Sequence, residues 1–147
     1  MPLITRLFLK TGLIFFVVSL LLGIIQQIDA LTVAALVPLF WHMLMVGWIT
    51  QVIIGVSLWM FPGRIKDEKF HNQRWAWITY FLLNIGLILR VVSEPMLEVS
   101  GAWGWKITLA ISAVLQFMAL LSYIREIWPR IMSKKQRIKK KRAKRKS

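Results

Sequence analysis

Four long runs of apolar residues, separated by short polar connections, dominate the chain. The runs extend over about residues 7–28, 37–61, 75–92 and 105–123. A helix needs about 20 mostly apolar residues to cross a membrane, and none of the runs alternates with period two as a barrel strand does. Because lipid cannot satisfy backbone polar groups, each run is predicted to be a helix. The pattern predicts an all-α, integral membrane domain over residues 1–130.

The connections between the runs are about 8–13 residues long. Short connections join antiparallel neighbours, so we predict an up-down four-helix arrangement. Proline marks three predicted ends: Pro62 after the second span, Pro95 after the third and Pro129 after the fourth. The first run ends in Gln26 and Gln27 without a small-x-small cleavage site, so it is predicted to be a retained span.

Composition narrows the class of protein further. Hydrophobic residues make up 57% of the 147 residues, charged residues make up 18%, and cysteine is absent. The absence of cysteine excludes a disulfide scaffold, thiolate-bound metal and a thiol nucleophile. The chain also contains no phosphate-binding loop, no HExxH and no Gly-rich dinucleotide fingerprint, so the case for an enzyme is weak.

Basic residues gather on one side of the predicted membrane. Lys and Arg number 20 against six Asp and Glu; the N-terminal end of the chain carries Arg6 and Lys10, four basic residues lie between the second and third spans, and twelve follow from Arg125 on. Cytoplasmic segments carry the excess of Lys and Arg, so both termini are predicted to be cytoplasmic. We expect a bacterial inner membrane.

The last segment, residues 131–147, is a polybasic tail without apolar periodicity and is predicted to be disordered. Lys139, Lys140, Lys141 and Arg142 form its densest run. Clusters of this kind next to a membrane bind anionic lipid headgroups. Nucleic acid is the other polyanion that such a run binds, but the tail has no aromatic residue for base stacking. We expect no specific nucleic acid partner.

The second span carries His42 near its predicted outer end. At 100° per residue, His42 shares an apolar strip with Met45 and Ile49, and this strip contains no carboxylate. An ionisable residue inside a span is a functional-site hypothesis by default. One interpretation is a wet, structural histidine at the headgroup boundary, and another is an apolar strip that faces lipid or a second copy. A third is a haem ligand, with the ring against aliphatic side chains and a nitrogen on iron.

Small residues occupy the other side of the same span. Gly47, Gln51 and Gly55 recur every four residues, a spacing that lets another helix approach closely. This face is therefore predicted to pack inside the bundle. The second histidine, His71, lies in the basic connection between spans two and three and is expected to be an ordinary loop residue.

The segment PLFWHMLMVGWITQVIIGVSLWMFPGR, residues 38–64, resembles the second membrane helix of haem–copper oxidase subunit I. The likeness is closest to the cbb3-type and nitric-oxide-reductase branches. The segment RWAWITYFLLNIGLILRVVSEP, residues 74–95, is similar to short four-span relatives of that subunit and to NnrS-type proteins. The resemblance implies one four-helix arc of subunit I, with His42 as an axial ligand of haem b.

The chain departs from that family in size and in its ligands. Subunit I has twelve spans and several intramembrane histidines, whereas this chain has four spans and one such histidine, His42. We therefore expect no copper, and we do not expect this chain to reduce oxygen by itself. Because subunit I consists of three four-helix arcs, a homotrimer that shares His42 ligands across its interfaces is a hypothesis. A larger membrane complex is the other assembly that we expect.

Other polar residues lie within the spans. Tyr80, Asn84, Gln51 and Gln116 predict hydrogen bonds between helices, with a proton path as the less favoured interpretation. Arg90 and Glu94, spaced i and i+4, predict an interfacial ion pair. If haem is bound, Arg90 is expected to pair with a propionate, with Ser93 and Trp103 as weaker candidates.

Two classes of function remain from the sequence. The first is a haem b protein for electron transfer or for sensing a diatomic gas. The alternative is a non-catalytic accessory subunit that packs against a larger membrane complex without haem. A transporter half is disfavoured because no broken helix or midplane charge is evident.

Overall fold

A computed structural model describes residues 1–28, 34–61 and 73–131. The helices are α1 (Leu3–Ile25), α2 (Leu36–His42), the π-helix η2 (Met43–Thr50), α3 (Gln51–Met60), α4 (Arg74–Ser100), α5 (Trp103–Ile127) and the short 3₁₀ turn η3 (Trp128–Arg130). The described part of the chain contains no strand. Since α2, η2 and α3 follow one another without a break, they form a single span.

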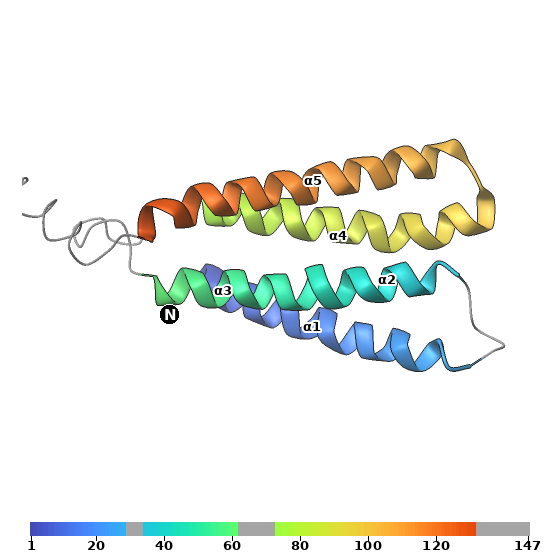
Figure 1. Ribbon diagram of the computed structural model, residues 1–147, viewed down its shortest axis with the longest axis horizontal. Coiled ribbons are helices and arrows are strands. Elements are labelled where there is room, and N and C mark those ends of the chain that lie inside the picture. Colours follow the sequence, from blue (N-terminus) through green and yellow to red (C-terminus); the bar gives the residue numbers. More distant parts are fainter. Residues whose placement is uncertain (29–33, 62–72, 132–147) are drawn as a thin grey trace, which may run out of the picture.

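Among the described residues, four helices are long and apolar enough to cross a membrane: Leu3–Ile25, Leu36–Met60, Arg74–Ser100 and Trp103–Arg130. They lie side by side, and successive spans run in opposite directions (Figure 1). The start of α1, the end of α3, the start of α4 and the end of α5 lie at the same end of the bundle. The protein is therefore an all-helical, four-span membrane protein, as the apolar runs predicted.

The spans form two hairpins, which we call the N-terminal hairpin (α1 with α2–η2–α3) and the C-terminal hairpin (α4 with α5). The spans within each hairpin pack closely along their length. A buried apolar core forms where the two hairpins meet at the end that holds the N-terminus. Its members are Ile4, Phe8, Ile54, Leu58, Ala76, Leu83, Leu87 and Ala119.

The third span is longer than predicted. The sequence placed its end near residue 92 with Pro95 outside it, but α4 continues through Pro95 to Ser100 and ends at Gly101, which has φ 60°. Proline removes one helical N–H donor without stopping this helix. The added turns place Glu98 against the start of α2, where its carboxylate oxygens accept hydrogen bonds from the backbone N–H groups of Ala34 (3.1 Å) and Ala35 (2.5 Å). This contact ties the end of α4 to the N-terminal hairpin.

Of the two other helix ends that proline predicted, the structure describes the one at Pro129 and not the one at Pro62. α5 ends at Ile127, and Pro129 follows within η3. Pro62, His71 and the lipid-binding candidates Lys139, Lys140, Lys141 and Arg142 lie outside the described residues.

Glycines bring the helices of each hairpin together. A Cβ atom on Gly47 would lie 2.8 Å from the ring of Phe15, and one on Gly55 would lie 3.0 Å from Cβ of Phe8. Gln51, between these glycines, is fully buried. The face of the second span that carries residues 47, 51 and 55 therefore packs against α1.

Most large apolar side chains on the outside of the bundle remain exposed. Examples are Ile14, Val17 and Ile24 on α1 and Val114 and Phe117 on α5. An apolar exterior of this kind suits a lipid environment, since a soluble protein rarely exposes patches of this extent.

The close approach at Gly47 predicts a stability effect. We expect Gly47→Ala to lower the free energy of unfolding by about 1–3 kcal/mol, because the new methyl group must displace Phe15. Thermal unfolding in detergent measures it. Gly104→Ala is the matched control, since a Cβ there meets nothing within 4 Å, and it should be neutral or stabilising. Equal stability of the two variants would contradict the predicted packing.

Candidate functional site

His42 is the last residue of α2, immediately before the π-helix η2. In η2 the hydrogen bonds span five residues, and the Thr50 hydroxyl also bonds to the Met45 carbonyl oxygen, five residues earlier (2.8 Å). π-helical turns are rare and occur frequently at functional sites. Their wider turns also change which side chains share a face, so a wheel drawn at 100° per residue does not hold across this span.

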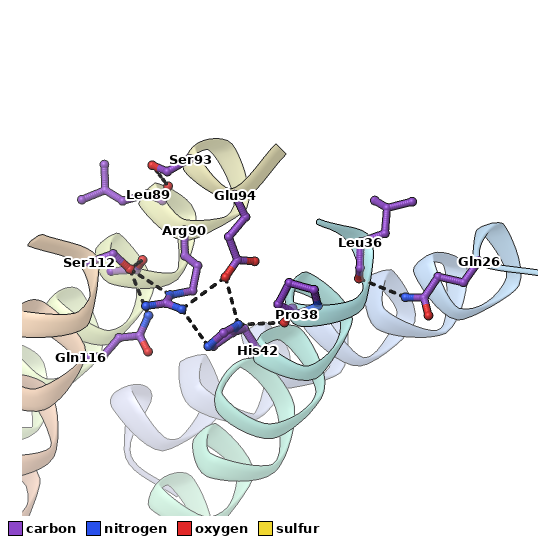
Figure 2. A network of polar contacts seen from close by, with 11 residues as sticks. Gln26, Leu36, Pro38, His42, Leu89, Arg90, Ser93, Glu94, Ser112 and Gln116 are labelled. Carbon is purple, nitrogen blue, oxygen red and sulfur yellow. Dashed lines mark hydrogen bonds and ion pairs between the residues drawn. The ribbon is translucent and has the colours of Figure 1, made fainter. Parts of the chain in front are cut away.

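The predicted environment of His42 is wrong in one respect. The sequence placed the imidazole on an apolar strip with no carboxylate partner, but it faces α4 and lies 3.2 Å from Glu94 (Figure 2). Its helix neighbour Met45 is 44% exposed, and Ile49 is half-buried. The partner was missed because it comes from another helix, 52 positions along the chain.

Both nitrogens of the His42 ring have partners. Nδ1 lies 2.7 Å from the carbonyl oxygen of Pro38, and Nε2 lies 2.8 Å from Nη1 of Arg90 (Figure 2). A guanidinium group can only donate. Nε2 must therefore accept the hydrogen bond from Arg90, and the ring proton lies on Nδ1. The Pro38 carbonyl oxygen and the Glu94 carboxylate are placed to accept a hydrogen bond from this N–H group. This geometry corresponds to the neutral Nδ1–H tautomer.

Arg90 links His42 to the C-terminal hairpin. Its Nη1 also donates to Glu94 (3.2 Å), which is the i, i+4 ion pair that the sequence predicted. Its Nε points toward the Ser112 hydroxyl on α5 at 3.4 Å. Ser112 donates to the Gly86 carbonyl oxygen (2.7 Å) and accepts from Gln116 (3.2 Å). The cluster thus joins α2, α4 and α5.

Burial increases from the histidine to the carboxylate. The side chains of His42, Arg90 and Glu94 are 30%, 16% and 8% exposed. Glu94 Oε2 is buried and has no hydrogen-bond partner among the described residues. Arg90 and His42 both contact its other oxygen, Oε1. His42 is therefore the most exposed of the three side chains.

The remaining candidates lie apart from this cluster. Ser93 donates to the Leu89 carbonyl oxygen (2.6 Å), and Trp103 is exposed. Gln51 donates to Asn84 (3.1 Å), and Tyr80 shares a hydrogen bond with Thr11 (3.0 Å). These two are hydrogen bonds between helices of the kind that the polar residues predicted, although the partner of Tyr80 was not foreseen. The prediction is wrong for Gln116, which donates to Ser112 on its own helix, α5.

The side chains that could bind a metal are few in the described residues. No group of three or more His, Asp or Glu side chains within residues 1–28, 34–61 and 73–131 could hold a bare metal ion. A haem needs from the protein only one or two axial ligands, and His42 offers one nitrogen for that role.

Comparison of the chain with protein-family models, with curated proteins and with solved structures returns no match.

The burial of the ion pair predicts a non-additive effect. We expect Arg90→Met to destabilise the protein by about 3 kcal/mol, because it leaves the buried Glu94 carboxylate without its arginine partner. The double variant Arg90→Met/Glu94→Gln should be more stable than Arg90→Met alone, since it removes the uncompensated charge. Unfolding of the single and double variants in detergent measures the coupling. Strictly additive effects would contradict the described contact.

Proposed function

We propose that the protein is a polytopic membrane protein that holds haem b through His42, for electron transfer or for sensing a diatomic gas. The observation that carries the proposal is the way in which the imidazole is held. Nδ1 lies against the Pro38 carbonyl oxygen and the Glu94 carboxylate. Metal-ligating histidines usually donate their second N–H to such groups, which fixes the ring and leaves the Nε2 lone pair for the metal. The resemblance to subunit I points to the same residue.

Arg90 has a defined part in this proposal. Its guanidinium now holds Nε2, so it must leave that nitrogen before iron can bind there. Guanidinium groups pair strongly with carboxylates, and haem carries two propionates. The loss of the Arg90–His42 hydrogen bond would therefore be offset by an Arg90–propionate pair. Bound haem would supply one-electron redox chemistry or a coordination position for a small gas.

A second axial ligand would come from another molecule. The sequence contains one further histidine, His71, in the basic connection outside the spans. The partial exposure of His42 allows contact with a neighbouring copy. We therefore propose a homo-oligomer, with the trimer as the specific hypothesis, in which two His42 side chains share one haem. No copper is part of this proposal.

One observation favours a second candidate function. Both nitrogens of His42 already have partners within the chain, so the ring does not need a ligand to be satisfied. In that case His42 connects the two hairpins of a non-catalytic accessory subunit that packs in a larger membrane complex. The site then stabilises the fold and has no redox role.

The charge distribution supports a location and an orientation. We propose a bacterial inner membrane with both termini in the cytoplasm, because positive residues stay on that side. The basic tail would then lie next to anionic lipid headgroups.

Visible absorption of the purified protein tests the haem proposal. After expression with ample haem, we expect sharp α and Soret bands on reduction with dithionite, and we expect His42→Ala to lose them because the axial nitrogen is gone. His71→Ala is the matched control and should keep the bands. The molar ratio of haem to protein chains would be below one if copies share the haem. A colourless wild-type protein would support the accessory-subunit function instead.

A further inference from the structure

The first turns of α1 carry a groove on the surface of the bundle. It has a volume of about 210 Å³ and is lined by Leu3, Arg6, Leu7 and Lys10. Residues at this spacing share one face of a helix. Ile4, Thr5 and Phe8 belong to the opposite face and are buried. The groove therefore opens away from the bundle, at the end where α1 and α4 begin and α5 ends (Figure 1).

The two cations at the groove have no acidic partner among the described residues. Residues 1–28 contain no Asp or Glu. The described carboxylates have other partners: Glu94 contacts Arg90 and His42, Glu98 contacts the start of α2, and Glu126 contacts Arg130. Arg6 and Lys10 are exposed. Within the part of the chain that the structure describes, they therefore present two positive charges without an acidic partner at one end of an apolar helix.

The surface next to these cations is apolar in the direction of the membrane interior. Leu13, Ile14 and Val17 follow Lys10 on α1 and are exposed. Arg6 and Lys10 are one turn apart, about 6 Å along the helix axis, so their flexible side chains can reach one phosphate group. A ligand that fits here has an anionic head and a long apolar tail.

We infer that this groove is a binding site for a phospholipid with an anionic headgroup. The phosphate lies between Arg6 and Lys10, and an acyl chain follows α1 past Leu13 toward Val17. The site is independent of His42 and of haem. It also differs from the tail, because its two cations are held on a helix beside an apolar surface.

The contribution of Arg6 and of Lys10 to lipid affinity determines how much their removal should weaken binding. A Lys or Arg near an anionic membrane surface contributes about a fivefold change in affinity. Removal of both Arg6 and Lys10 should therefore weaken anionic lipid binding by about 25-fold. Inorganic phosphate lacks the apolar tail and should not displace the lipid.

Native mass spectrometry of the full chain tests the site. The protein in mild detergent receives equal amounts of phosphatidylglycerol and phosphatidylcholine with identical acyl chains. We expect preferential binding of phosphatidylglycerol, lost in Arg6→Gln/Lys10→Gln. The comparison variant, Lys139→Gln/Lys140→Gln, removes the same charge from the tail, which is itself expected to contact headgroups, and should reduce the preference less than Arg6→Gln/Lys10→Gln does. Thermal unfolding verifies that both variants fold.

Three outcomes would overturn the inference. Loss of the preference in the tail variant alone would place lipid binding in the tail. Equal loss in both variants would show an effect of net charge rather than of a site. Displacement of the lipid by excess inorganic phosphate would mean that the groove binds a simple anion.

Discussion

The two helical hairpins are held to each other by a line of polar contacts, which we call the polar seam. From one end of the bundle to the other it contains Glu98 with the start of α2, His42 with Arg90 and Glu94, Gln51 with Asn84, Thr11 with Tyr80, and Ser57 with Tyr123. Within a membrane, apolar helix faces gain nothing by leaving lipid, so packing and hydrogen bonds must join helices. Each such bond contributes about 0.6 kcal/mol on average. The relative position of the hairpins, and hence of His42, depends on their sum.

The charged part of the seam differs from the rest in what it can do. Gln51, Tyr80 and Ser57 are neutral, and a structural role, the joining of the two hairpins, explains their hydrogen bonds. His42, Arg90 and Glu94 include a buried carboxylate with an unpaired oxygen and a histidine that reaches the surface. Buried ion pairs are weak contributors to stability because of their desolvation. A functional role gives a reason for this cluster, and the π-helical turn directly after His42 points to the same place.

The sequence predicted the spans well and the site only in part. Long apolar runs located all four helices because the thickness of the membrane fixes their length. The end of α4 was predicted wrongly, since Pro95 usually terminates a helix and the stabilising contact of Glu98 comes from residues 34 and 35. Arg90 and Glu94 were predicted as a pair because they are four residues apart. Their contact with His42 depends on the rotation of α2 and on η2, which no periodicity in the chain reveals.

The ¹⁵N chemical shifts of the His42 ring would test the seam most directly. A His71→Asn variant, prepared without haem in detergent, leaves His42 as the single histidine. The contacts with Pro38 and Arg90 predict a protonated Nδ1 and an unprotonated Nε2 that accepts a hydrogen bond. In Arg90→Met the Nε2 shift should move because its donor is lost. A proton on Nε2, or shifts that do not respond to Arg90→Met, would contradict the described contact between the hairpins.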